Sequence, residues 1–186
     1  LGAVAARLGR ENEAYEACLK RAARADPLGQ SAASNLQSSR DVLRWAQGAF
    51  DQLGRARRDD PNAEFCEGLT AWFSGNVNEA QTRFHRVTAM AGAHAVAWAY
   101  KSMAIARGSS KGDAVAMASR AVQIDRNSGL AHAALAWAHL KKGQTTKAGV
   151  EATYAEKLSP SMLLPKVVTA DTLASAGSPE KARALL

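Results

Sequence analysis

Residues 129–162 read GLAHAALAWAHLKKGQTTKAGVEATYAEKLSPSM, and this stretch determines how the rest of the sequence is interpreted. Its first part places apolar side chains at helical spacing. Gly143 then follows, and glycine tolerates the left-handed backbone conformation that ends many helices. The stretch therefore predicts two helices, over 130–142 and 146–158, joined by a tight turn.

The same pattern returns every 34 residues. Small side chains recur at Ala80, Ala114, Ala148 and Ala182, at Gly75, Ser109, Gly143 and Gly177, and at Gly68, Ser102, Ala136 and Ala170. Large aliphatic ones recur at Met90, Ile124 and Leu158. A fixed period of this length is typical of stacked helical hairpins, and small side chains let two helices approach closely. The other expected helices run over 62–74, 78–90 (with Asn78 as N-cap), 95–107 and 112–125, and a final copy begins near Pro165.

The pattern resembles the tetratricopeptide repeat family. The copy at 129–162 carries Ala136, Gly143, Ala148, Tyr154, Ala155, Leu158 and Pro160 at family-like places. Gly92 and Arg126 stand where Pro160 stands, and Ser109 replaces the turn glycine. The resemblance implies an all-α fold: an α-solenoid of stacked antiparallel helical hairpins that forms a right-handed superhelix.

We expect two parts in the chain. Divergent hairpins of the same kind are expected over 1–60, because Asp26-Pro27 and Asp60-Pro61 also lie 34 residues apart. Within that part, a hairpin over 1–25 and a helix over 41–58 flank a stretch, 28–39, that is either helix or loop. The second part is expected to hold repeats 61–94, 95–128 and 129–162 and a truncated fourth over 163–186. Because the chain starts at Leu1 and breaks off within a copy, we expect a piece of a longer protein.

Composition and charge narrow the classes of protein. No run of about 18 uncharged apolar residues is present, which predicts no membrane span. Residues 81–150 carry ten basic and two acidic side chains, a net charge of +8 against +7 for the whole chain. This positive charge favours acidic partners, RNA among them. Alternatively, it keeps the protein soluble and stabilises helix ends. Nucleic acid is disfavoured because the sequence lacks Arg-Gly runs and interleaved basic and aromatic residues.

No catalytic constellation is found in the sequence. His132 and His139 are seven residues apart, too far for the i, i+4 pair of a helical metal site, and are expected to pack. Cys18 and Cys66 are too few for a disulfide framework and lack a CxxC partner. The stretch 108–112 resembles a phosphate loop only superficially, since no strand precedes it. We therefore expect no enzyme activity, no cofactor and no metal. The sequence leaves the compartment open: the cytoplasm is slightly favoured, and a periplasmic or envelope location is the alternative if a signal peptide was removed.

The resemblance implies that the first helix of each hairpin lines a concave groove. The expected lining is Asn62, Phe65, Leu69, Trp72, Phe73, Val96, Met103, Arg107, Leu130, Trp137, Leu140 and Lys141. Soluble proteins rarely leave so apolar a set bare. We therefore expect a non-catalytic scaffold that binds a hydrophobic or amphipathic helix or peptide of a partner protein, with Arg107 and Lys141 near an acidic flank. Alternatively, Trp72 and Trp137 pack in the core.

Three other interpretations stay open. One is a regulatory or docking module of a larger enzyme, signalling or transcription protein, and another is self-association. A clamp for acidic C-terminal tails fits poorly, because clamps in the family resemble each other in presenting Lys, Asn and Arg along the groove. Here Phe65, Met103 and Trp137 stand at such places, and a carboxylate buried among them would lack a partner. The third is binding of an acidic polymer through the basic segment 81–150.

Overall fold

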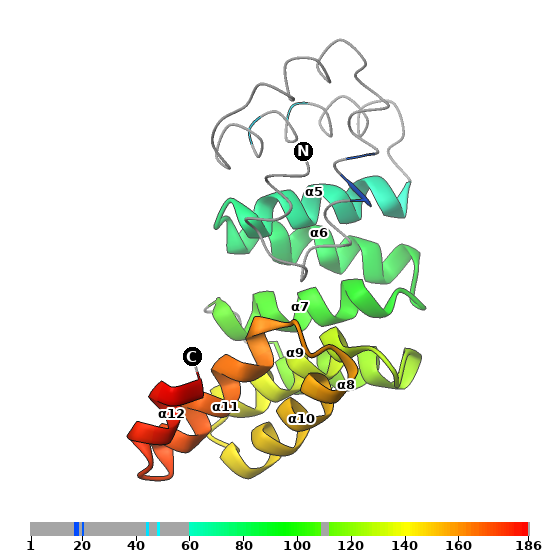
Figure 1. Ribbon diagram of the computed structural model, residues 1–186. Helices are drawn as coiled ribbons and strands as arrows, with labels where there is room; N and C mark the ends of the chain where they lie inside the picture. Colours follow the sequence, from blue (N-terminus) through cyan, green and yellow to red (C-terminus); the bar gives the residue numbers. More distant parts are fainter. Residues whose placement is uncertain are drawn as a thin grey trace. The chain divides into compact units, whose positions relative to one another are not determined.

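The computed structural model describes residues 17, 18, 20, 44, 48, 60–108 and 112–185 (Figure 1). The chain divides into two compact units, Leu1–Gly92 and Ala93–Leu186, which we describe separately. Apart from those five single positions, the hairpins and the helix expected within 1–58 lie outside the described residues. No strand occurs in the described ranges, and none of their helices is long and apolar enough to span a membrane.

The described part of the first unit is a helical hairpin. Helix α5 (Pro61–Phe73) is followed by α6 (Val77–Met90). Gly75 lies between them with a φ of 80°. This is the left-handed conformation expected of a glycine that ends a helix, and it turns the chain back on itself.

Side-chain caps set where the two helices begin. The Asp60 carboxylate accepts a hydrogen bond from the backbone N–H of Asn62 at 2.9 Å and caps α5. The amide oxygen of Asn76 accepts one from the N–H of Glu79 at 3.3 Å and caps α6. The expected cap at Asn78 is therefore wrong by two positions. The glycine turn is short, so the helix has already begun when the chain reaches Asn78.

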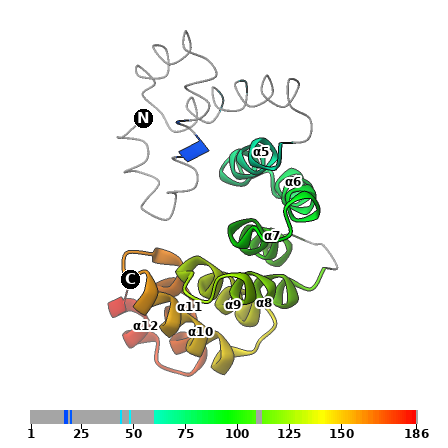
Figure 2. The same ribbon diagram turned by 90° about the vertical axis from the view of Figure 1, so that its right-hand side faces the viewer.

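The described part of the second unit contains three helical hairpins (Figure 2). Their helices are α7 (Ala95–Arg107) with α8 (Ala114–Ile124), α9 (Gly129–Lys141) with α10 (Thr145–Leu158), and α11 (Leu163–Ser175) with α12 (Pro179–Leu185). Helix α9 packs against α7, α8, α10 and α11. The first helices α7, α9 and α11 therefore lie side by side. Helix α8 packs on α7 and α9, and helix α10 packs on α9 and α11.

The small-residue registers are the places where paired helices meet. All eight positions of two registers are buried: Gly68, Ser102, Ala136 and Ala170, and Ala80, Ala114, Ala148 and Ala182. The Ser102 hydroxyl donates a hydrogen bond to the carbonyl of Ala114 at 2.7 Å, so its polar atom is satisfied at the contact. A methyl group on Gly68 would lie 2.7 Å from a ring carbon of Phe84. Small side chains are thus a steric requirement of the hairpins.

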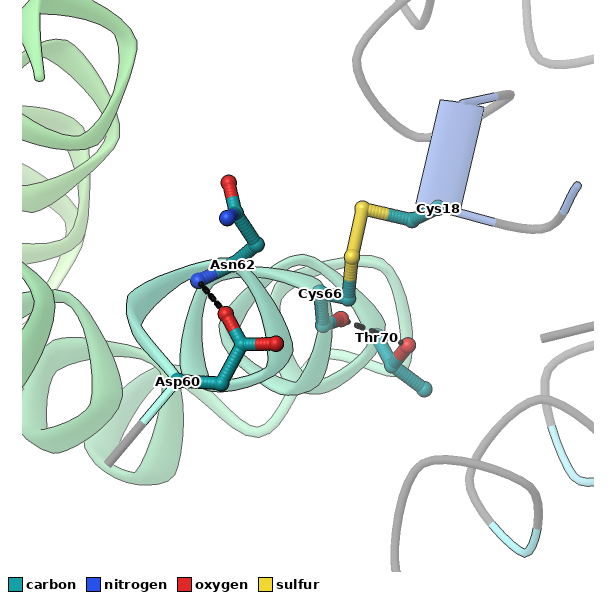
Figure 3. Close-up of a disulfide and its surroundings, with 5 residues drawn as sticks. All are labelled: Cys18, Asp60, Asn62, Cys66 and Thr70. Carbon is teal, nitrogen blue, oxygen red and sulfur yellow. Dashed lines mark hydrogen bonds between the residues drawn. A yellow bond between two sulfur atoms is a disulfide. The ribbon is translucent and has the colours of Figure 1, made fainter. Parts of the chain in front are cut away.

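A disulfide joins Cys18 to Cys66 of α5, with Cα atoms 5.4 Å apart (Figure 3). The bond uses both cysteines of the chain, and both are buried. This pairing was not expected from the sequence, because a separation of 48 residues leaves no local spacing pattern. Disulfides persist in oxidising compartments and are rare in a reducing cytosol. The bond therefore favours an oxidising compartment over the cytoplasm.

Replacing Gly68 with alanine is expected to lower the free energy of unfolding by roughly 1–3 kcal/mol, because the Phe84 ring is fully buried and cannot move away. Gly149→Ala is the matched control within α10. Nothing lies within 4 Å of its added methyl, so about 0.5–1 kcal/mol of stabilisation is expected. Urea denaturation followed by circular dichroism measures both. A Gly68→Ala protein more stable than wild type would contradict the steric argument.

Replacing both cysteines with serine, or reducing the disulfide, is expected to lower the free energy of unfolding by about 2–4 kcal/mol. The bond restricts the unfolded chain over a separation of 48 residues. Denaturation curves with and without dithiothreitol measure the change. The double serine variant is the control, because reductant should leave its curve unchanged. An equal response of both proteins to reductant would argue against the bond.

Candidate functional site

One side of α7 and α9 holds several of the expected lining residues. Helix α9 carries Leu130, Trp137 seven residues later, and Lys141 four residues after that. This spacing places all three on one side of the helix. Val96 and Arg107 hold the corresponding places of α7, 34 residues earlier. We call these five residues the first-helix face. Its three apolar side chains are half-buried, and its two cations are exposed.

The half-buried apolar side chains of α9 pack against buried residues, most of which are alanines. Trp137 and Leu140 pack against the buried cluster of Ala136, Ala148, Ala152 and Val168. Leu130 packs against Ala133, Ala155 and Met162. Each large side chain is therefore fixed by the core on one side and keeps exposed area on the other. Such fixed apolar groups bind a partner with little loss of side-chain freedom.

Three of the expected lining residues are part of the core instead. Phe65, Leu69 and Met103 are only 6%, 0% and 4% exposed. Phe65 contacts Phe84 of α6, with ring centroids 6.0 Å apart. The repeat register gives the position of a residue but does not show how far neighbouring helices cover it. These three side chains are therefore removed from the expected lining.

The other expected residues of the first unit remain at or near the surface of α5. Asn62 is exposed, while Trp72 and Phe73 are half-buried. They belong to a different unit from the first-helix face. The proposal below is therefore built on the second unit alone.

Arg83 of α6 neutralises a group of carboxylates on α5 and α6. It pairs with Glu79 at 2.6 Å, with Glu64 at 3.2 Å, and with Glu67, which is only 4% exposed. Burial acts to lower the pKa of Arg83. The hydrogen bond to Glu79 and the charges of Glu67 and Glu64 outweigh this effect, and the pKa is raised above its usual value.

Other cations of the basic segment also have partners inside the fold. Arg86 lies 3.4 Å from Glu64, and Lys142 lies 2.8 Å from Asp113. The Lys101 ammonium lies 4.7 Å from the centre of the Trp98 ring. Several cations of segment 81–150 therefore interact with other residues of the fold. This weakens the case for an extended surface that binds an acidic polymer.

The histidines take capping and packing roles. Nδ1 of His94 accepts the backbone N–H of Ala97 at 3.1 Å at the start of α7, and burial lowers the pKa of His94. Nδ1 of His139 lies 2.6 Å from the amide oxygen of Gln144, and His139 is buried as expected for a packing residue. No group of three potential metal ligands occurs within the described part of the chain.

A hollow of about 470 Å³ lies beside His132 in the second unit, and no pattern in the sequence indicated it. We call it the α8–α10 hollow. Its lining is Val122, Gln123, Arg126, Asn127, His132, Tyr154, Lys157 and Leu158. Of these, Tyr154 and Leu158 are residues that carry the family resemblance in the repeat 129–162.

Hydrogen bonds hold His132 in the lining of this hollow. Its Nδ1 lies 2.7 Å from Oε2 of Glu151, and its Nε2 lies 3.0 Å from the carbonyl of Arg126. The imidazole centre is 5.7 Å from that of the Tyr154 ring. The α8–α9 turn, α9 and α10 are thereby held together around one hollow.

Similarity to known proteins is found at the level of structure. No family model and no curated protein matches the sequence. Among solved structures, MamA residues 41-end from Desulfovibrio magneticus RS-1 matches with a TM-score of 0.64 and 16% identity, over 95% of this chain and 92% of that one. TTC0263, a thermophilic TPR protein of Thermus thermophilus, matches with a TM-score of 0.69 and 16% identity, over 92% of this chain and 87% of that one.

The chain has the tetratricopeptide-repeat fold. YrrB, described as a TPR protein with an unusual peptide-binding site, is also similar, with a TM-score of 0.57 and 17% identity over 81% of this chain and 78% of that one. The predicted fold class, an all-α solenoid of TPR hairpins, is confirmed by these likenesses and by the helical hairpins described above. At such identities the likeness concerns the fold alone.

Replacing Arg83 with methionine is expected to lower the free energy of unfolding by roughly 3 kcal/mol, because the buried Glu67 loses its partner. Arg86→Met is the matched control. The Arg86 side chain is 57% exposed, and Glu64 keeps its pair with Arg83, so a loss below about 1 kcal/mol is expected. Urea denaturation measures both. Adding Glu67→Gln to Arg83→Met should recover part of the loss, and equal losses for the two arginine variants would contradict this account.

Proposed function

We propose that this TPR protein is a non-catalytic scaffold that binds a segment of a partner protein on the first-helix face. The observation that carries the proposal is the row of half-buried apolar side chains, Val96, Leu130 and Trp137, on two adjacent helices. TPR neighbours support a role in protein interaction, and one of them is described as having a peptide-binding site.

The chemistry of the face favours an amphipathic segment. Large apolar residues supported by core alanines provide the kind of fixed hydrophobic contact that an apolar helix stripe requires. Trp137 is the expected centre of the contact, since buried tryptophans often contribute most to binding. The segment would thus place apolar residues at helical spacing over Leu130 and Trp137.

Two cations suggest how the segment is oriented. Arg107 and Lys141 lie in the last turns of α7 and α9, at corresponding places of two repeats. An acidic flank of the ligand near these helix ends would complement both charges. Charge complementarity of this kind raises the association rate and fixes the register of binding.

Selection of peptides from a displayed library on the full chain, followed by titration, tests the proposal. We expect selected peptides to combine apolar residues at helical spacing with an acidic flank. Trp137→Ala should weaken binding by at least about tenfold. Replacing Arg107 and Lys141 with glutamine should mainly slow association and reduce its salt dependence.

Met90→Ser is the matched control, because it removes an exposed apolar side chain of α6 in the other unit. Its affinity for the selected peptides should equal that of the wild type. Circular dichroism verifies that each variant retains its helices. Peptides that bind Trp137→Ala as tightly as wild type would refute the proposed face.

A further inference from the structure

Helix α10 presents an exposed apolar stripe that leads into the α8–α10 hollow. Val150, Tyr154 and Leu158 are 52%, 53% and 41% exposed and follow one another at intervals of four residues, so they share one side of the helix. Two of them, Tyr154 and Leu158, also line the hollow, together with Val122 of α8. Exposed apolar groups gathered at a hollow mark a binding site more often than scattered ones do.

The polar part of the lining is positive. Arg126 and Lys157 are exposed, and neither forms an ion pair within the described part of the chain. The lining contains no carboxylate. Glu151 of α10 lies beside the lining, with its Oε2 2.7 Å from Nδ1 of His132. This differs from Arg83 and Lys142, whose charges are matched by carboxylates of the fold.

A further cation stands next to the hollow. The Arg120 guanidinium donates a hydrogen bond at 3.3 Å to the side-chain oxygen of Gln123, a lining residue. Three cations, Arg120, Arg126 and Lys157, therefore stand in or beside the hollow. Two carboxylates stand beside it: Asp125 accepts the backbone N–H of Asn127 at 3.0 Å, and Glu151 contacts His132. The cations thus outnumber the carboxylates. A ligand that fits such a site combines an apolar group with surrounding negative charge.

We propose that the α8–α10 hollow binds a large apolar side chain from an acidic segment of a partner protein, at a second site distinct from the first-helix face. The apolar side chain enters between Val122, Tyr154 and Leu158. Carboxylates on either side of it pair with Arg126 and Lys157. A volume of about 470 Å³ is within the usual range of ligand pockets and accommodates a leucine or phenylalanine side chain.

The charges argue against two other occupants. A second copy of this chain seated on the same patch would bring like cations together, which is unfavourable. A nucleic acid requires a long basic track with stacking aromatic side chains. Here the cations surround one hollow that contains a single tyrosine, Tyr154. An acidic peptide with one apolar anchor satisfies both the shape and the charge.

The test uses the full chain and three synthetic peptides. The first is a short glutamate-rich peptide with one central phenylalanine, the second has alanine in its place, and the third has lysines in place of the glutamates. We expect binding of the first peptide only. Chemical-shift changes in 15N-labelled protein should cluster around Val122, Asn127 and Tyr154. Equal binding of the lysine peptide, or shifts located elsewhere, would overturn the proposal.

Variants locate the site and separate it from the first-helix face. Tyr154→Ala should weaken binding of the phenylalanine peptide by at least about tenfold, and Arg126→Gln and Lys157→Gln by about two- to fivefold each. Trp137→Ala should leave this peptide's affinity unchanged, even where it abolishes binding at the first-helix face. Lys181→Gln is the control, because it removes the same charge from α12, outside the hollow. A Tyr154→Ala variant that binds like wild type would overturn the proposal.

Two further measurements address the rejected occupants. Light scattering across a concentration range should give the same mass for wild type and Tyr154→Ala. An oligomer that Tyr154→Ala dissolves would assign the stripe to a second copy and overturn the proposal. The second measurement is competition with an oligouridylate: if it displaces the phenylalanine peptide, and if its binding depends equally on Arg126 and Lys157, the site binds nucleic acid and the proposal is overturned.

Discussion

Close contact between paired helices is the constraint on which the hairpins of this protein depend. Ser102 meets the backbone of Ala114 at hydrogen-bond distance, and Ala136 and Ala148 lie in one buried cluster. At Gly68 even one methyl group would collide with Phe84. Helices this close have no room for large side chains between them. The bulky residues therefore lie to the sides of the contact, in the core between helices or on an outer surface.

That distribution creates two surfaces of different character in the second unit. On α7 and α9, half-buried Val96, Leu130 and Trp137 rest on small core residues, with cations at the helix ends. On α10, Tyr154 and Leu158 border a hollow whose cations have no carboxylate partner in the described chain. Both surfaces arise because the alanines that bring the helices together contribute little apolar area of their own.

The basic segment illustrates why charge in a sequence is ambiguous. Arg83, Arg126 and Lys142 belong to the basic segment 81–150, and Lys157 follows it. Apart from the i, i+4 pair of Arg83 with Glu79, the order of residues does not show which of these cations face a carboxylate. In the structure Arg83 and Lys142 face carboxylates of the fold, whereas Arg126 and Lys157 border an apolar hollow. Most of those carboxylates lie on other helices or turns, so the sequence does not show which cation each of them pairs with. The same holds for Cys18 and Cys66, which are 48 residues apart.

The helical hairpins could be predicted from the amino-acid order, because their signs are local or periodic. Glycine at Gly75 and Gly143 adopts the left-handed turn, and small residues recur every 34 positions. The cap at Asn76 rather than Asn78 shows the limit of such signs, since several polar residues near a turn are equally able to cap. Which apolar side chains stay exposed became known only from the packing of the helices. Phe65 and Trp137 were both expected to line the groove, but the first is buried, and the second is half-buried and packs against a core cluster. Exposure depends on what neighbouring helices cover, and no pattern within one helix records that.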